Sequence, residues 1–341
     1  MVFLDYASTC PIVKFSSQQH DGFQCNPNAA YAYVERKVLM GCEERIKAAI
    51  GVKGGHVLYF RCATEAIDWL LHETDNWTDT WGHSPYEHDA CLFGIRRLPD
   101  KLMSLDFYIH QWVNHVTGEI FDLKTIRSQL HETCKLIVDA TAGFGKAKLP
   151  SDLDNIADAL FMSGHKIGCP ELSFMWLSDN LCKWLGAAKD IRNQWGLHHG
   201  SLSVASVLAL TDAVEWACEN GDRVDRHSLR LYVQMDDMLD KARVEHHDVS
   251  ENQMCTCSIN AIRLNGINAD ALQQFLASRG IYVGVGGSAC SAAHDYRVLR
   301  AYGLTDDEAA EVIRVSFGDE TTASDINALV EGIKEYRRQF C

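Results

Sequence analysis

The chain has 341 residues, of which 47% are hydrophobic and 23% charged, a composition typical of a soluble globular enzyme. Its formal net charge of −14 argues against a protein that mainly grips nucleic-acid phosphates, and we expect no direct nucleic-acid binding. No apolar stretch approaches the roughly 18 residues that a membrane helix needs, and the N-terminus lacks a secretory signal, so we expect a cytoplasmic protein without membrane association.

In chain order, strand-like and helix-like segments alternate through the first two thirds of the sequence. The predicted strands are short apolar runs, and the predicted helices carry apolar residues at helical spacing. The expected elements are the strand 56–60, the helix 65–72, and the strands 102–109, 136–138, 159–162 and 174–177. This alternation predicts an α/β fold with a mainly parallel sheet covered by helices on both faces.

The pattern changes after a long predicted helix at 203–219. The later expected elements are the strand 257–264, the helix 270–278, the strands 281–283 and 313–317, and an amphipathic helix at 324–340. They indicate a smaller α+β lobe. We therefore expect a large domain over residues 13–215 and a small domain formed by residues 1–12 and 216–341, joined by the helix near residue 215.

The thirteen cysteines are odd in number and scattered along the chain. Only Cys255 and Cys257 lie close together, and no Cys-x-x-Cys motif occurs. This pattern favours free thiols in a reducing compartment over a disulfide framework or a zinc site. The histidine pairs at 198–199 and 246–247 lie in polar stretches, where solvated side chains are commoner than ligands, so no metal site is predicted.

Lys166 ends the sequence Ser163-Gly164-His165-Lys166, which follows the predicted buried strand 159–162. A lysine that leaves a buried strand is easily desolvated and can then lose its charge. Its neutral amine can attack an aldehyde to form an imine, which is how proteins hold pyridoxal 5'-phosphate (PLP). Most lysines are solvated, so the motif alone is weak evidence for a cofactor anchor.

Other polar residues follow predicted strands, where open parallel sheets bind ligands. Asp139 ends the strand 136–138 and could keep the PLP ring nitrogen protonated, the alternative being a turn aspartate. Ala63 and Thr64 open a helix whose N–H groups and dipole favour a phosphate, the alternative being a helix cap without a ligand. His88 could stack on a cofactor ring and shuttle protons, the alternative being an exposed loop histidine.

The glycine-rich segment 284–291 carries Cys290. Three glycines in four residues give a mobile backbone, and a mobile, exposed thiol suits nucleophilic attack followed by delivery to a partner. Arg314 lies in the apolar strand 313–317 and needs a counter-charge. Either a substrate carboxylate or a structural salt bridge would supply that charge.

Together these segments resemble the NifS/IscS-like cysteine desulfurases, which are class V PLP enzymes of fold type I, nearly from end to end. Many motifs in one order are far more specific than any single motif. The matching motifs are Phe3-Leu4-Asp5-Tyr6-Ala7-Ser8-Thr9, Asn26-Pro27-Asn28, Ala63-Thr64-Glu65-Ala66, Glu87-His88, Val138-Asp139-Ala140, Ser163-Gly164-His165-Lys166, Gly287-Ser288-Ala289-Cys290 and Ile313-Arg314-Val315-Ser316.

The resemblance implies a reaction. Lys166 would hold PLP and remove the Cα proton of L-cysteine, while Asp139 keeps the ring protonated and His88 stacks on it. Cys290 would attack the substrate sulfur and keep it as a persulfide while L-alanine leaves. The persulfide would then pass to an acceptor protein.

The resemblance also implies binding residues for the substrate. Arg314 would hold the substrate carboxylate. A gap-free match anchored on Gly118 puts His115 at the family's substrate-contacting asparagine, whereas Asn114 takes that role if the loop shifts.

The expected cofactor contacts beside the anchor are partly changed in this chain. Where the family has a glutamine three residues after the aspartate, this sequence has Ala142, and its Arg-x-Gly-Thr motif becomes the segment 198–201 without the arginine. In the family the last residue of that motif, Ser201 here, reaches the phosphate from the neighbouring subunit, which implies a homodimer. The full set of expected cofactor-binding residues is Ala63, Thr64, His88, Asp139, Ser163, His165, Lys166 and Ser201.

The leading hypothesis is an active cysteine desulfurase. Iron–sulfur assembly, tRNA thiolation and DNA phosphorothioation all start from the same persulfide, so the acceptor is open. A selenocysteine lyase or a class V aminotransferase is the first alternative, although a transaminase has no need of Cys290. A non-catalytic scaffold that binds a sulfur carrier is the second, and the joint presence of the catalytic residues speaks against it.

Overall fold

The computed structural model describes residues 1–340 except 21, 24, 75–79, 93–104, 251–252 and 287–295. The chain divides into two compact units, which are described separately. The larger unit comprises Ile12–Trp112 and Asp122–Asn220. The smaller unit comprises Met1–Pro11, Val113–Phe121 and Gly221–Cys341.

The segment Val113–Phe121 belongs to the smaller unit, although the predicted large domain of residues 13–215 includes it. The backbone explains this difference, because the amide of Thr256 donates to the carbonyl oxygen of Gly118 at 2.9 Å. Gly118 has a φ of +78°, and a Cβ there would lie 2.2 Å from the carbonyl oxygen of Ile259. A glycine is therefore required for the segment to reach the smaller unit.

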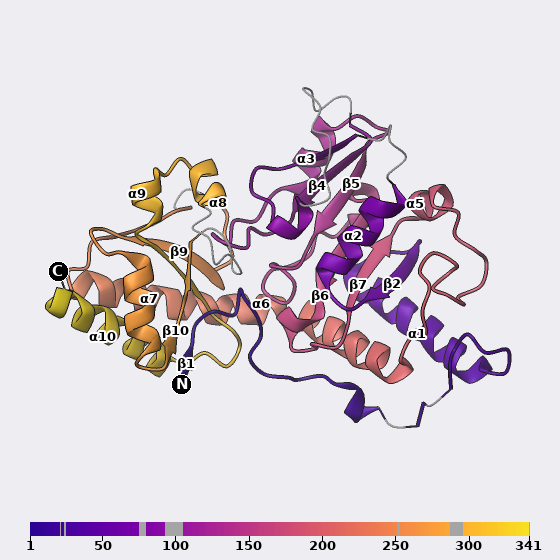
Figure 1. The fold of residues 1–341 in the computed structure, drawn as a ribbon, viewed down its shortest axis with the longest axis horizontal. Coiled ribbons are helices and arrows are strands. Elements are labelled where there is room, and N and C mark those ends of the chain that lie inside the picture. The colour runs from indigo at the N-terminus through magenta and orange to yellow at the C-terminus, as the bar shows by residue number, and fades with distance from the viewer. Residues whose placement is uncertain are drawn as a thin grey trace. The chain divides into compact units, whose positions relative to one another are not determined.

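A six-stranded sheet forms the centre of the larger unit, in the order β2-β7-β6-β5-β4-β3 (Figure 1). Its neighbouring strands are parallel except in the two pairs that involve β7. Most strand residues are buried, so both faces of the sheet are covered. The strands are β2 (His56–Phe60), β3 (Trp81–His83), β4 (Phe107–Gln111), β5 (Lys135–Asp139), β6 (Ala159–Ser163) and β7 (Ser173–Leu177).

Helices pack on this sheet. Leu58 and Phe60 of β2 belong to one apolar cluster with residues of α2. Because side chains alternate along a strand, Tyr59 faces the opposite side of the sheet, toward α1. Burial there, together with nearby Cys42 of α1, raises the pKa of Tyr59. Arg45 joins α1 to the long helix α6 (Val204–Lys241) through ion pairs with Asp212 and Glu215. The helices are α1 (Tyr33–Ile50), α2 (Ala63–Glu73), α3 (Leu123–Gln129), α4 (Leu153–Ile156), α5 (Asp179–Trp184) and the 3-10 helices η1 (Ser17–Gln19), η2 (Asp89–Cys91) and η4 (Gly164–Ile167).

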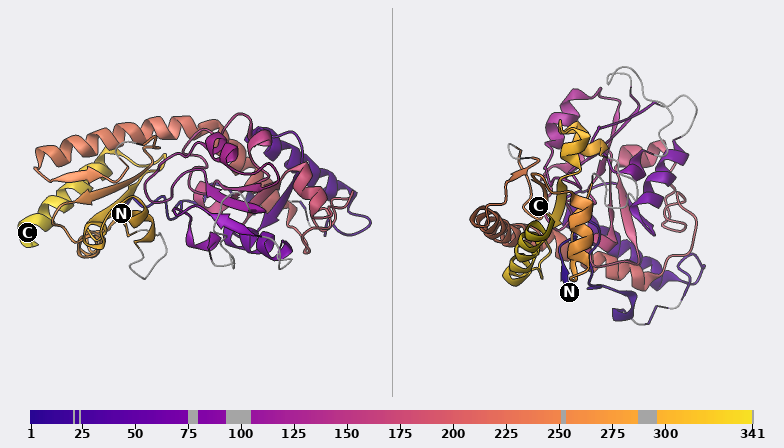
Figure 2. Two further views of the ribbon diagram at one scale, coloured as in Figure 1. Left: turned by 90° about the horizontal axis from the view of Figure 1, so that it is seen from above. Right: turned by 60° about the vertical axis from the view of Figure 1, so that its left-hand side comes forward.

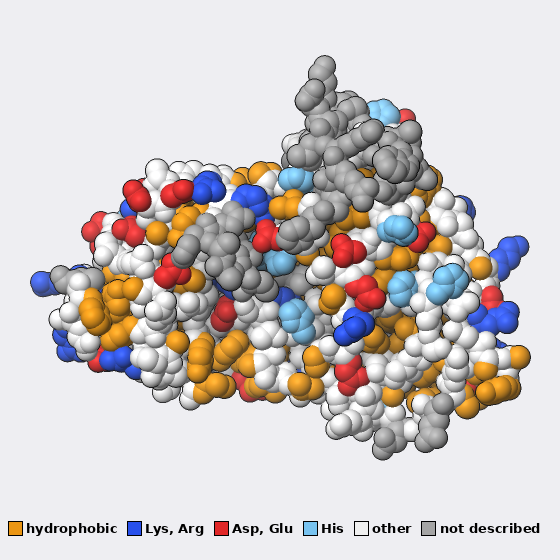
Figure 3. Space-filling model, in the orientation of Figure 1, with side chains coloured by type: hydrophobic (Ala, Val, Ile, Leu, Met, Phe, Trp, Pro, Cys, Tyr) orange, Lys and Arg blue, Asp and Glu red, His pale blue; other side chains and the backbone are white. Residues whose placement is uncertain are grey.

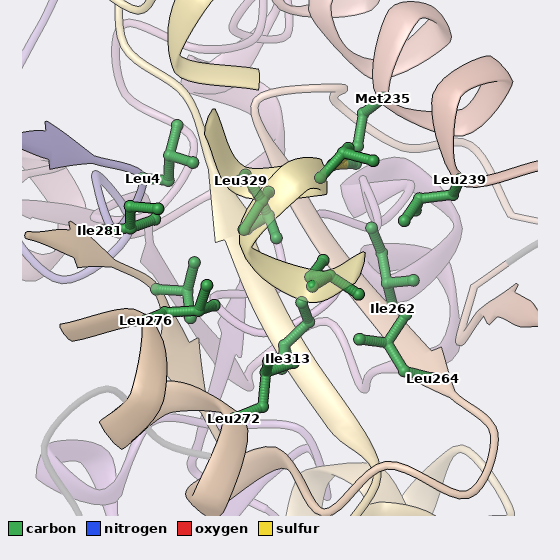
Figure 4. Close-up of a cluster of buried hydrophobic side chains, with 14 of the residues drawn as sticks. Leu4, Met235, Leu239, Ile262, Leu264, Leu272, Leu276, Ile281, Ile313 and Leu329 are labelled. Atoms are coloured by element: carbon green, nitrogen blue, oxygen red, sulfur yellow. The ribbon is translucent and has the colours of Figure 1, made fainter. Parts of the chain in front are cut away.

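The smaller unit has an antiparallel sheet in the order β11-β12-β9-β8 and the parallel pair β1-β10. Figure 4 shows its core, where aliphatic side chains from strands and helices point toward one another. Its elements are β1 (Val2–Phe3), β8 (His246–Asp248), β9 (Ile259–Leu264), β10 (Ile281–Tyr282), β11 (Gly284–Val285), β12 (Val312–Ser316), α7 (Ala269–Ala277), α8 (Arg297–Ala301), α9 (Asp306–Ala309) and α10 (Ala323–Phe340).

Helix α6 (Val204–Lys241) is 38 residues long and contributes to both units. Figure 2 shows it as one uninterrupted helix, much longer than the predicted helix 203–219. Apolar residues continue at helical spacing beyond Gly221 and join the core of the smaller unit, which explains the extension. These later core residues are Leu231, Met235 and Leu239.

The described surface mixes charges. On the face drawn in Figure 3, acidic and basic side chains are interspersed rather than gathered into broad fields of one sign. Among the described residues, no helix combines the length and apolar character that crossing a membrane requires.

Candidate active site

The carboxyl ends of the parallel strands lie along one edge of the larger sheet, which is where such sheets bind ligands. Three of the predicted cofactor residues follow these ends. Asp139 is the last residue of β5, Lys166 follows β6, and Thr64 follows β2. The fold therefore brings residues that are 27 and 75 positions apart along the chain to one edge, with β5 and β6 as direct neighbours.

Asp139 is 7% exposed, and both of its carboxylate oxygens have donors. The amide of Thr141 donates to Oδ1 at 2.8 Å, and the thiol of Cys91 lies 3.9 Å from Oδ2. The hydroxyl Oγ1 of Thr141 is buried and has no hydrogen-bond partner among the described residues. Ala142, at the family's glutamine position, is buried and supplies no side-chain donor.

Lys166 lies in η4, the single 3-10 turn that links β6 to β7. The turn folds back tightly, because a Cβ at Gly164 would lie 2.0 Å from the carbonyl oxygen of Leu172. Ser163 at the end of β6 is buried, and its hydroxyl lies 3.3 Å from that of Ser173 on β7. Lys166 is thus held just beyond the end of β6 and is partly exposed.

His165 and His88 accompany this lysine. Burial, together with the positive charges of Lys166 and Lys146, lowers the pKa of His165 to about 4, so the imidazole is neutral at pH 7. His88 precedes η2, and its Nδ1 accepts a hydrogen bond from the amide of Ala90 at 3.1 Å. A neutral His88 therefore carries its proton on Nε2.

Sequence reasoning gave no role to two further polar residues at this edge. Lys146 is only 5% exposed and is close enough to His165 to affect its pKa. Glu87 is fully buried, and its Oε1 accepts from the hydroxyl of Ser84 at 2.5 Å and from the amide of Gln111 at 2.8 Å. The ligand atoms of Glu87, Cys91 and Asp139 lie within 4.8 Å of one another. Lys146 comes seven positions after Asp139, and that short spacing is the signal that could have indicated Lys146.

The expected phosphate contacts lie at the surface. Cys62 caps α2, with its sulfur accepting from the amide of Glu65 at 3.5 Å, and Thr64 is exposed in the first turn beside Ala63. Ser201 is also exposed. His198 does not replace the family's arginine as a cation, because burial lowers the pKa of this half-buried imidazole, which lies 4.7 Å from the Phe60 ring.

The residues before Ser201 form an unusual turn. Asn193, Gln194 and Trp195 have φ values of +50°, +50° and +62°, a left-handed conformation that is costly for residues other than glycine. Their contacts hold it in place. The side-chain amide of Gln194 accepts from the backbone amide of Tyr59 at 2.6 Å and donates to its carbonyl oxygen at 3.2 Å. The Trp195 ring stacks on His56 at 3.9 Å.

The predicted substrate residues come together in the smaller unit. Arg314 on β12 is 3% exposed, and its NH1 donates to the carbonyl oxygen of His115 at 3.0 Å. Asn114 is fully buried, and its Oδ1 accepts from the amide of Val116 at 2.8 Å. Among the described residues, neither Nε of Arg314 nor Nδ2 of Asn114 has an acceptor. Cys290 lies outside the described residues.

Comparison with known proteins identifies the family. The model of the class-V aminotransferases matches residues 104–329, which is more than half of the chain. The chain belongs to the class-V aminotransferase family. The chain is 26% identical to a cysteine desulfurase IscS of Mannheimia succiniciproducens, covering 98% of this chain and 92% of that protein. It is 24% identical to IscS 1 of Archaeoglobus fulgidus, covering 97% and 95%.

Solved structures share the fold of this chain. The structure of a NifS-like protein from Rickettsia africae matches with a TM-score of 0.83 at 19% identity, covering 99% of both chains. This likeness confirms the predicted fold type I architecture. Family membership and the named relatives confirm the expected resemblance to cysteine desulfurases. They also confirm that the chain is a PLP-dependent enzyme.

The residues at the sheet edge fit the cofactor of this class-V enzyme. A buried carboxylate, Asp139, lies at the end of β5 and can pair with a protonated ring nitrogen. The buried Oγ1 of Thr141 still has hydrogen-bonding capacity, and Lys166 lies at the end of the adjacent strand. These are the groups that a pyridine ring and its aldehyde require.

Replacing Asp139 with asparagine is expected to lower kcat by roughly a hundredfold or more, because an amide cannot hold a proton on the ring nitrogen as a carboxylate does. The measurement is sulfide release from L-cysteine at saturating substrate, with PLP content determined in parallel. Asp152→Asn is the matched control, since Asp152 pairs with Lys124 at the surface. An unchanged kcat in Asp139→Asn would contradict the role given to this carboxylate.

Proposed function

We propose that this enzyme removes sulfur from free L-cysteine, holds it as a persulfide on Cys290, releases L-alanine and passes the sulfur to an acceptor protein. The observation that carries this proposal is the pair Lys166 and Asp139 at the ends of the adjacent strands β6 and β5. Relatives named as cysteine desulfurases over nearly the whole chain support it.

The residues of the larger unit have distinct tasks in this proposal. PLP, when bound, supplies an electron sink at the substrate carbon. Lys166 binds the cofactor aldehyde and takes the Cα proton on Nζ. Asp139 holds the ring nitrogen protonated. His88 offers its ring face for stacking while the amide of Ala90 fixes its orientation.

The smaller unit supplies the substrate carboxylate site. Arg314 is the buried cation on β12, and a carboxylate is the anion that its guanidinium recognises best. The buried donors Arg314 Nε and Asn114 Nδ2, which have no acceptor among the described residues, support an anion site at this cluster. The carbonyl of His115 orients the guanidinium, so His115 contributes through its backbone.

The sulfur step belongs to Cys290. Its thiolate attacks the sulfur of the substrate, so that a sulfur–sulfur bond forms as the bond between Cβ and sulfur breaks. The Cβ atom keeps the electron pair and takes up a proton, which completes alanine. The terminal persulfide sulfur then passes to a nucleophile of the acceptor, for iron–sulfur assembly, tRNA thiolation or DNA phosphorothioation.

A homodimer in the cytoplasm is part of this proposal. Near the N-terminal end of α1, large apolar side chains are exposed, and such a patch is typical of a protein interface. They are Tyr31 (79% exposed), Tyr33 (69%) and Val34 (61%). The exposed Ser201 supports the same arrangement, since in the family this position serves the neighbouring subunit.

Product analysis tests the proposal. The purified, PLP-loaded protein with L-cysteine and a thiol reductant is expected to form alanine and sulfide in equal amounts. A transaminase would instead convert the amino acid into a keto acid without sulfide, and a selenocysteine lyase would release alanine from selenocysteine but not from cysteine. A non-catalytic scaffold would form none of these products, and any of these three outcomes would overturn the proposal.

A further inference from the structure

Asp5 of the N-terminal segment forms an ion pair with Arg314, the buried arginine of the smaller unit. NH2 of Arg314 donates to Oδ1 of Asp5 at 2.7 Å, and the Asp5 side chain is 18% exposed. NH2 also lies 3.5 Å from the hydroxyl of Ser8. The cation that is proposed to bind a substrate carboxylate therefore has a carboxylate of the chain beside it.

The backbone fixes Asp5 in this position. Leu4 is fully buried in the core of the smaller unit, and Asp5 forms a parallel bridge with Ser316 of β12. The amide of Ser316 donates to the carbonyl oxygen of Leu4 at 2.8 Å, and that of Ala7 donates to the Ser316 hydroxyl at 2.8 Å. Asp5 is thus held by strand pairing rather than by its ion pair alone.

Gly284 leaves the space that this ion pair needs. It pairs with Arg314 across β11 and β12. A Cβ at Gly284 would lie 3.0 Å from Nε of Arg314 and 3.1 Å from Oδ1 of Asp5, closer than ordinary contacts. Because Gly284 has no side chain, the guanidinium and the carboxylate can both lie close to β11. Gly284 precedes Cys290 by six positions in the sequence.

We propose that Asp5 sets the affinity of Arg314 for amino-acid carboxylates, by orienting the guanidinium and by partly neutralising its charge. This inference rests on the proposed function, in which Arg314 binds the substrate. L-Alanine carries the same carboxylate as L-cysteine, so an unscreened arginine would hold product as tightly as substrate. Equal binding of all states does not speed the reaction, and a screened cation lets the product leave.

The two actions of Asp5 can be separated because they change KM in opposite directions. Asp5→Asn keeps an acceptor oxygen for Arg314 but removes the negative charge, so the KM for L-cysteine is expected to fall by about fivefold. Asp5→Ala removes the acceptor as well, so the guanidinium is no longer oriented and KM is expected to rise by about tenfold or more. A purely structural role would not give opposite signs.

The binding of L-alanine, measured by calorimetry on the PLP-loaded protein, is expected to follow the same order. Asp237→Asn is the matched control, because Asp237 forms an exposed ion pair with Lys241 on α6, and neither constant should change. Gly284→Ala, which crowds the pair, is expected to raise KM as Asp5→Ala does. Gly41→Ala on α1 is its control, because a Cβ there meets nothing within 4 Å.

An Asp5→Asn variant that is folded, as judged by thermal unfolding, and whose KM rises together with that of Asp5→Ala would overturn the proposal. So would an unchanged KM in both variants. The alanine measurement separates this failure from failure of the proposed function. A wild-type protein that releases no sulfide would refute desulfuration, whereas the order of alanine affinities would still support or refute the role of Asp5.

Discussion

Replacement of Lys166 with alanine is expected to abolish turnover, with a loss of at least about a thousandfold in kcat. The amine has two tasks in the proposed reaction, since it binds the cofactor aldehyde and accepts the Cα proton, and alanine can do neither. Lys166 lies in η4, directly after β6, and it is the lysine of that turn. Sulfide release from L-cysteine measures the loss.

Reduction with borohydride provides a second readout that does not depend on activity. In the wild-type protein, the reduced cofactor should be found covalently attached to the peptide that contains Lys166, and the variant should carry no label. Lys148→Ala is the matched control, because Lys148 is an exposed lysine of the same unit. Labelling of Lys146, the buried lysine nearby, would show that the anchor has been assigned to the wrong residue.

Cys290→Ser is expected to bind PLP normally and to release sulfide at least about a thousandfold more slowly than the wild type. A serine hydroxyl keeps nearly the size of the thiol but does not ionise near neutral pH, and it is a poor nucleophile toward sulfur. Incubation with sulfur-labelled cysteine followed by peptide mass analysis should place one extra sulfur atom on the wild-type peptide that contains Cys290. A variant that releases sulfide at the wild-type rate, or that carries the sulfur label on another cysteine, would show that Cys290 is not the persulfide residue.

The control variant for Cys290→Ser is chosen by the exposure and pKa of the other cysteine thiols. Burial raises the pKa of Cys134 and Cys169 to about 11 and that of Cys182 and Cys218 to about 12, which leaves almost no thiolate at pH 7. Cys25 is exposed and is therefore the stricter comparison. Cys25→Ser should keep full sulfide release.

Much of the larger sheet could be predicted from sequence, because its strands are apolar runs that are buried on both faces. The predicted strand 56–60 coincides with β2, and those at 136–138 and 159–162 lie inside β5 and β6. The reversed direction of β7 could also have been inferred. The link from β6 to β7 is too short for the dozen or more residues that a parallel crossover requires.

Long-range pairing limits what the sequence can predict about the candidate site. The spacing places Lys166 and Asp139 one strand–helix–strand step apart, and the sheet puts them on neighbouring strands. In contrast, Asp5 is 309 positions from Arg314, and no local pattern indicates that the two are paired. Helix α1 is absent from the expected elements, and the predicted strand 102–109 begins in residues that are not described, with β4 covering Phe107–Gln111.

The hydrogen bonds between Gln194 and Tyr59 also bear on an exposed edge of the larger sheet. Strand β2 is one of the two edge strands of the larger sheet, so one row of its backbone groups faces outward and could pair with a strand from another molecule. The amide of Gln194 occupies both the N–H and the C=O of Tyr59, in the middle of β2. The left-handed turn thus covers the middle of this edge of the sheet, and an aliphatic residue at position 194 would leave the N–H and C=O of Tyr59 open to pairing with a strand of another molecule.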